Sequence, residues 1–105
     1  MLKTHNNEAE SSNGFVTSFA TDGFTLADND GPANRHSDGG TFVAWNWDMG
    51  GSNATNSNGS ITSTVRANPT YGQSIVSYNG NATNGATVGH GLSSSPEMIM
   101  VKNRD

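Results

Sequence analysis

Hydrophobic residues along the chain alternate with polar ones in short runs, a period of two that is typical of β-strands. The first run is Phe15–Phe19 and the second is Phe24–Leu26. Between them, Asp22-Gly23 is a dipeptide that favours a hairpin turn. The pattern therefore predicts a hairpin in which phenylalanine side chains meet across the two strands.

The clearest alternation in the chain lies in Thr41–Met49, where Val43, Trp45 and Trp47 alternate with smaller or polar residues. No amphipathic helix gives this period. Both tryptophans of the chain share one face of the run, and each can bury on the order of 200 Å². We expect this segment to be a strand and to form the core.

The second half of the chain contains a further series of short strands and turns. Gly50–Ser60 is low-complexity sequence, which indicates a flexible connection. Asn68–Gly72 has the composition of a turn, and Asn79-Gly80 favours a hairpin. Gln73–Tyr78 is apolar on both faces at its middle, which favours a central strand. The four strands expected in this half are Ser60–Val65, Gln73–Tyr78, Ala86–His90 and Glu97–Lys102.

The composition indicates an all-β chain with a small core. Hydrophobic residues make up 31% of the 105 residues and charged residues 13%, against about 25% charged in ordinary domains. Polarity comes instead from Asn, Ser, Thr and Gly. A domain of this size buries only about two-thirds of its unfolded surface. We therefore expect either a flat β-rich fold with one small core or a fold that depends on neighbouring chains.

Several classes of protein are excluded. The formal net charge is −4 and the five basic residues are scattered, which argues against a nucleic-acid surface. Without cysteine, the chain has no disulfide, thiolate metal site or cysteine nucleophile. No apolar run approaches the roughly 20 residues that cross a membrane. There is also no phosphate-binding loop, nucleophile motif or plausible carboxylate pair, so we expect a soluble chain that is not an enzyme and needs no cofactor.

Six segments carry a resemblance to a known group of modules. They are Asp22–Leu26, Thr41–Trp47, Gly59–Val65, Gln73–Tyr78, Ala86–Leu92 and Pro96–Arg104. Together they resemble an uncharacterised family of β-rich modules of phage and marine-metagenome tail and structural proteins, in which a "DGFTL … YVAWCWKAGG" pattern recurs. The resemblance implies an antiparallel β-sandwich of jelly-roll or concanavalin-like type for complete modules.

The same resemblance implies the organisation of the chain. In that family the Trp-x-Trp strand ends one module and the Ser-Ile-Val-x-Tyr strand starts the next, so residues 50–60 would mark a junction between two half-modules. The sandwich is then incomplete, or completed by a neighbouring chain. We expect residues 1–13 to be a loose N-terminal segment and residues 14–105 to form a single β-rich module.

Four residues are candidates for ligand binding: Tyr71, Trp45, Trp47 and Asp48. The two tryptophans could stack on a sugar ring, although Val43 and Met49 on the same face favour a core role. Tyr71 lies on a predicted turn and is the better candidate for contact with a glycan. Asn79 and Asp48 are the polar residues that could accompany it.

Two further features have a plain structural interpretation. His90 stands between two glycines, and we expect it to hydrogen-bond locally where the backbone can approach closely. Asp28, Asp30 and Asp38 offer the oxygen ligands that calcium prefers, but position twelve from Asp28 is Gly39, which excludes an EF-hand. Asp, Asn and Gly equally form turns, so we predict a turn and no metal site.

The sequence therefore predicts a non-enzymatic structural or adhesion module of a phage tail fibre or virion surface protein. Its expected location is the virion, or the extracellular space after assembly. The alternative is a carbohydrate-binding module that recognises a host surface glycan. Met98–Val101 or the tryptophan strand would form an unpaired sheet edge, which is a template for another chain. We therefore expect a homo-oligomer.

Overall fold

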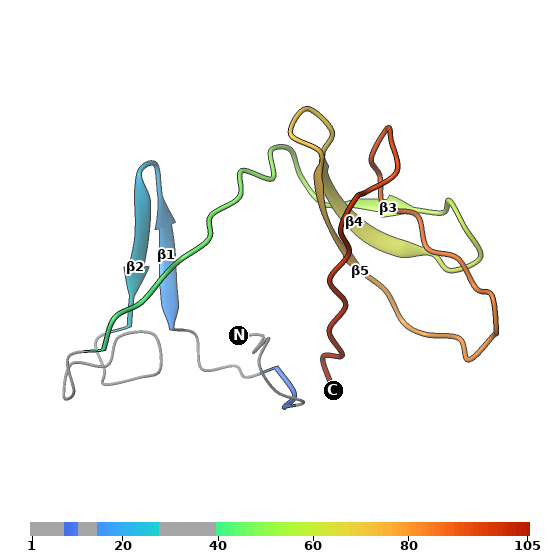
Figure 1. Cartoon of the computed structure of the whole chain (residues 1–105), viewed down its shortest axis with the longest axis horizontal. Coiled ribbons are helices and arrows are strands. Elements are labelled where there is room, and N and C mark those ends of the chain that lie inside the picture. Colours follow the sequence, from blue (N-terminus) through green and yellow to red (C-terminus); the bar gives the residue numbers. More distant parts are fainter. Residues whose placement is uncertain (1–7, 11–14, 28–39) are drawn as a thin grey trace. The chain divides into compact units, whose positions relative to one another are not determined.

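The computed structural model describes residues 8–10, 15–27 and 40–105 (Figure 1). These residues form an all-β structure with five strands and no helix, so the predicted all-β class is confirmed, whereas the antiparallel sandwich stays a prediction. The chain divides into two compact units: Met1–Ala44 together with Met100–Asp105, and Trp45–Ile99. The loose segment over 1–13 and the single module over 14–105 stay predictions.

The first unit contains the predicted hairpin. Strands β1 (Val16–Ala20) and β2 (Gly23–Leu26) pair antiparallel. Phe19 lies opposite Phe24, which confirms the expected phenylalanine pair. The connecting residues are Thr21-Asp22, one position before the predicted turn, and Asp is a residue that such tight turns accommodate.

The second unit contains a three-stranded antiparallel sheet in the order β3-β4-β5. Its strands are β3 (Ala54–Asn56), β4 (Ser63–Asn68) and β5 (Gln73–Ser77). The predicted turn joins β4 to β5, and the Tyr71 amide donates to the Asn68 carbonyl oxygen at 3.2 Å. The strand predicted at Gln73–Tyr78 is confirmed, but its predicted central position is wrong because β4 has a strand on each side and β5 is an edge.

Strand β3 lies in the segment that the sequence predicted to be a flexible connection. It pairs with β4 through Ala54 opposite Val65 and Asn56 opposite Ser63. Composition alone favoured a loop here, and the pairing with β4 overrides that local preference. The four residues Asn53–Asn56 recur as Asn81–Asn84, and this second copy lies outside the strands.

The expectation of a tryptophan strand at the core is wrong. Thr41–Met49 belongs to neither sheet, and the side chains of Trp45 and Trp47 are 73% and 56% exposed. Alternation specifies a buried strand face only where a second strand pairs with the segment and a layer covers it. Neither sheet of the described residues supplies that strand.

Two other predicted strands are reduced or absent. Ala86–His90 contributes one parallel bridge, between Val88 and Ile61. Glu97–Lys102 forms no strand in the described chain. The strand predicted at Ser60–Val65 exists but begins at Ser63, as part of β4.

The small core of the second unit forms where the 87–91 segment crosses β4 (Figure 1). Val65, at 7% exposed, is the one hydrophobic side chain buried among the described residues. A Cβ atom placed on Gly91 would lie 3.2 Å from Val65 and from Ala67. The backbone of the crossing segment therefore packs directly on the sheet.

Hydrogen bonds fasten the crossing segment to the residues before β4. The Ser60 amide donates to the Thr87 hydroxyl at 3.0 Å, and the Thr87 amide donates to the Ser60 hydroxyl at 2.9 Å. The Ile61 amide donates to the Thr87 carbonyl oxygen at 3.0 Å. This reciprocal pair satisfies backbone groups that would otherwise have to be hydrated.

Gly89 provides a direct test of this packing. A Cβ on Gly89 would lie 2.6 Å from the Asn58 carbonyl oxygen and 2.7 Å from the Asn56 side-chain nitrogen. We expect Gly89→Ala to lower the free energy of unfolding by about 1–3 kcal/mol, because the segment must move off the sheet. Urea unfolding of the whole chain measures this.

Gly80→Ala is the matched control. A Cβ on Gly80 would meet nothing within 4 Å, and its φ is not positive. This substitution should leave the midpoint unchanged or slightly raised. Equal effects of the two substitutions would contradict the crossing arrangement.

Candidate functional site

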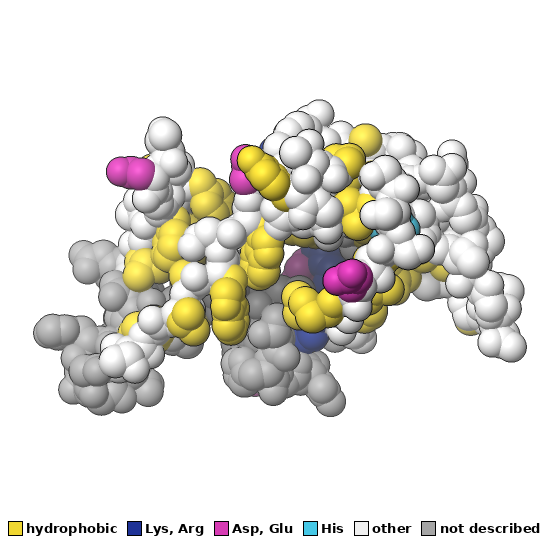
Figure 2. Space-filling view, turned by 45° about the horizontal axis from the view of Figure 1, so that its top comes forward, with side chains coloured by type: hydrophobic (Ala, Val, Ile, Leu, Met, Phe, Trp, Pro, Cys, Tyr) yellow, Lys and Arg dark blue, Asp and Glu magenta, His cyan; other side chains and the backbone are white. Residues whose placement is uncertain are grey.

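Three of the four candidate residues carry aromatic rings that lie on the surface. Tyr71 is 67% exposed, and the two tryptophans are likewise exposed. Figure 2 shows hydrophobic side chains, in yellow, on one face of the molecule. The rings are therefore open to a ligand, and the core role that the sequence favoured for the tryptophans is not realised.

Asp48 shapes the turn that follows Trp47. Its Oδ1 accepts a hydrogen bond from the Gly50 amide at 2.9 Å. Gly50 and Gly51 have φ angles of 52° and 40°, a left-handed conformation that glycine adopts without steric cost. The Asp-x-Gly-Gly sequence thus builds a compact turn locally.

Side chains of β4 hold this turn against the sheet. Arg66 donates from Nε to the Gly50 carbonyl oxygen at 2.9 Å and from Nη2 to the Gly51 carbonyl oxygen at 2.6 Å. Asn68 donates from Nδ2 to the Asp48 carbonyl oxygen at 2.9 Å. The turn is held by three hydrogen bonds from one strand, so the chain after Trp47 has a defined position.

Asn68 also connects this turn to the loop of Tyr71. Its side chain binds the Asp48 carbonyl, and its own carbonyl accepts the Tyr71 amide. The structure therefore gathers the segments of Trp47, Asp48 and Tyr71 at one end of β4. No hydrogen bond ties the side chain of Trp45 to that cluster. We call these three residues and Asn68 the β4-end cluster.

A polar groove of about 340 Å³ lies elsewhere on the same sheet. Hydroxyl and amide side chains line it, together with the partly exposed ring of Tyr78. The lining residues are Thr55, Thr62, Ser63, Thr64, Ser77, Tyr78 and Asn79. The sequence pointed to Asn79 but not to Tyr78, because the groove depends on the pairing of β3 with β4, which local composition did not predict.

His90 lies in a groove of about 290 Å³ formed by Asn58, Gly59 and the crossing segment. Its Nδ1 accepts a hydrogen bond from the Leu92 amide at 3.1 Å. This is the local hydrogen bond that the flanking glycines predicted, and it places the proton of the neutral ring on Nε2.

No group of three or more His, Asp or Glu side chains in the described residues is arranged to hold a metal ion. Asp28, Asp30 and Asp38 lie outside the described residues. Among the described residues there is also no helix that could cross a lipid bilayer.

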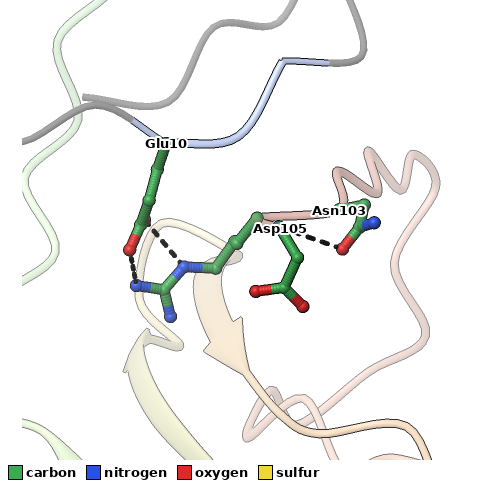
Figure 3. Close-up of polar contacts among 4 residues, drawn as sticks. Glu10, Asn103 and Asp105 are labelled. Atoms are coloured by element: carbon green, nitrogen blue, oxygen red, sulfur yellow. Dashed lines mark hydrogen bonds and ion pairs between the residues drawn. The ribbon is translucent and has the colours of Figure 1, made fainter.

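An ion pair joins residues 94 positions apart within the first unit (Figure 3). Arg104 donates from Nε to Glu10 Oε2 at 2.9 Å and from Nη2 to Oε1 at 2.6 Å. The Glu10 amide also donates to the Arg104 carbonyl oxygen at 3.0 Å. The hydrogen bonds from Arg104 lower the pKa of the Glu10 carboxyl, and the same contacts raise the pKa of Arg104.

A family model described as "Domain of unknown function (DUF7483)" matches residues 1–105. The chain belongs to this family. No curated protein and no solved structure matches the chain.

The Glu10–Arg104 ion pair should make the stability of the DUF7483 chain depend on pH. Because the folded pKa of Glu10 lies below the unfolded value, the pair favours the folded state above the unfolded pKa. That contribution is lost as the pH falls through the folded pKa. In a carbon-13 NMR titration the Glu10 carboxyl should titrate below the ordinary glutamate range, and Arg104→Gln should return it to that range.

Lys102→Gln is the control for this titration. Lys102 donates to the Glu8 carbonyl oxygen at 3.0 Å and not to Glu10, so the lowered pKa of Glu10 should persist. An unchanged Glu10 titration in Arg104→Gln would show that the guanidinium is not the cause.

Proposed function

We propose that this chain is a non-enzymatic structural or adhesion module that works by associating with further copies of itself. Its setting, a phage tail fibre or virion surface protein found on the virion or outside the cell, follows from the resemblance of its six sequence segments to such modules. The observation that carries the proposal is the distribution of apolar side chains, most of which lie on the surface.

Exposed apolar residues occur in both units, whereas Val65 is the one buried hydrophobic side chain among residues 8–10, 15–27 and 40–105. Those at least half exposed are Phe19, Phe42, Val43, Trp45, Trp47, Tyr71, Ile75, Met98, Ile99, Met100 and Val101. Soluble monomers rarely expose apolar surface on this scale, and larger patches mark interaction sites. Covering these side chains with a second chain would supply the burial that the single chain lacks.

Association would also complete the proposed sandwich. Each sheet has few strands, and a two-stranded hairpin is marginal in water by itself. A second layer from a neighbouring chain would cover the exposed sheet faces, as in the jelly-roll or concanavalin-like modules that the sequence resembles. Neither proposed role needs a cofactor, a nucleic acid or a membrane.

The solution mass tests the structural proposal. We expect light scattering on a size-exclusion column to give a dimer or larger homo-oligomer. The thermal melt should be cooperative, with a midpoint that rises with protein concentration, because association stabilises only the folded chain. A monomer with a cooperative, concentration-independent melt would contradict the proposal.

A carbohydrate-binding module that recognises a host surface glycan is the second candidate. The exposed aromatic rings at the β4-end cluster favour it, since exposed aromatic faces next to hydrogen-bonding groups suit sugar rings. Asp48 and Asn68 make the hydrogen bonds that fix the turn after Trp47, and these bonds hold the cluster in one conformation.

A glycan array identifies the ligand class in this second case. Trp47 belongs to the cluster and Trp45 lies two positions before it in sequence, so tryptophan fluorescence should change on binding. Trp47→Ala should weaken an array hit by about 5–150-fold, given about 1–3 kcal/mol for a lost aromatic stacking contact. Phe42→Ala is the control because Phe42 has the same exposed fraction, 56%. No array binding, or equal losses in both variants, would reject this candidate.

A further inference from the structure

The segment Glu97–Lys102 combines a strand-like sequence with an exposed apolar centre. Its four central residues, Met98 to Val101, are between 73% and 76% exposed. The segment has high β-propensity at Ile99 and Val101 and contains no proline or glycine. It therefore has the composition of a strand without belonging to either sheet of the described chain.

The ends of this segment carry opposite charges. Glu97 precedes the apolar run and Lys102 follows it. If two copies pair antiparallel about a twofold axis between Ile99 and Met100, Glu97 of each copy faces Lys102 of the other. In the same register Met98 faces Val101 and Ile99 faces Met100, so apolar residues oppose apolar residues throughout.

We propose that Glu97–Lys102 is the homotypic interface of this protein and pairs antiparallel with the same segment of a second copy. The inference rests on the proposed function, since it names the surface through which the chains associate. A twofold interface must be complementary to itself. In this segment an acidic residue is followed by four apolar residues and a basic one, so an antiparallel pair of copies is complementary to itself. Only one register achieves this, because a shift by one residue separates both pairs of opposite charges.

The neighbouring residues define the ends of the pairing segment. Pro96 precedes it, and proline cannot donate to a strand ladder. Arg104 follows it and is bound to Glu10. Lys102 donates to the backbone carbonyl oxygens of Glu8 and Asn103, and such contacts leave the ammonium a third proton for the carboxylate of a second copy.

Strand β5 is one of the sheet edges that could also recruit a second copy. Ile75 is exposed there, but β5 offers no charged residue to select a partner or a register. Opposite charges facing each other across strands stabilise a pair, and like charges destabilise it. The terminal charges therefore favour Glu97–Lys102 over β5.

Charge reversal tests the register. In Glu97→Lys every cross-strand ion pair becomes a Lys–Lys contact, and in Lys102→Glu a Glu–Glu contact. Each symmetric dimer contains two such contacts, so we expect either variant to raise the dimer dissociation constant about tenfold at low salt. The effect should shrink as added salt screens the exposed charges.

Mixing the two variants gives the decisive measurement. A Glu97→Lys chain paired with a Lys102→Glu chain restores both opposite-charge contacts, so differently tagged copies should form heterodimers in preference to homodimers. Analytical ultracentrifugation gives the dissociation constants, and native mass spectrometry gives the heterodimer fraction. Asp22→Lys makes the same charge change on the β1–β2 turn. Its dimer dissociation constant should equal that of the wild-type chain.

Cysteine cross-linking checks the strand direction in a chain that has no native cysteine. Antiparallel pairing places Met98→Cys of one chain opposite Val101→Cys of another, so a mixture should form the mixed disulfide on mild oxidation. Parallel in-register pairing would instead link Val101→Cys to itself, and that product would overturn the proposal.

The outcomes separate the two levels of inference. If the wild-type chain is monomeric, both the proposed function and this interface are wrong. If it associates but Glu97→Lys behaves like Asp22→Lys and the mixture shows no heterodimer preference, this interface alone is wrong. Disruption by Ile75→Asn without any effect of the charge reversals would assign the association to β5 and likewise reject it.

Discussion

The contact between the 87–91 segment and β4 is the interaction on which the second unit depends. It buries Val65, the one hydrophobic core residue of the described chain, beneath a backbone that carries no side chain at Gly89 or Gly91. On this sheet, no other hydrophobic side chain of the described residues is buried. The close approach is possible because glycine leaves room for the opposing carbonyl and side-chain atoms.

Because so little apolar surface is buried in this unit, polar contacts determine much of its geometry. Ser60 and Thr87 bond reciprocally, and Arg66 and Asn68 hold the turn after Trp47. Each such hydrogen bond contributes only about 0.5–1.5 kcal/mol net, while ordering one residue costs about 1–2 kcal/mol of backbone entropy. Hydrogen bonds therefore define the geometry of the chain, but burial of apolar surface has to supply much of its stability. That requirement connects the small core to the proposal of association.

The sequence predicted contacts between residues close together in the chain. The hairpin of β1 and β2, with Phe19 opposite Phe24, and the turn before β5 were correct because a turn dipeptide and alternation specify them locally. Strand β3 was missed because Ala54–Asn56 becomes a strand only through pairing with β4. Local composition carries no information about such a partner.

At the candidate site, too, the sequence predicted local features but not contacts between distant residues. Exposure of Tyr71 followed from its position on a turn, and the local hydrogen bond of His90 followed from the flanking glycines. The bonds from Arg66 to the carbonyls of Gly50 and Gly51 span 15 or 16 positions and have no sequence signature. From sequence alone, an arginine in a strand is predicted to be solvent-exposed. Its hydrogen bonds to the turn become evident only in the folded chain.

The two largest errors concern the two most apolar runs, Thr41–Met49 and Glu97–Lys102, and they share a cause. Both have the sequence of strands, and both lie outside the sheets with their apolar side chains exposed. Alternation and β-propensity describe a surface that fits a neighbouring strand, but they do not say which chain provides it. If that strand comes from a second copy, the sequence pattern and the structure of the single chain agree: the pattern encodes the associated state, and the exposed runs are what the single chain leaves uncovered.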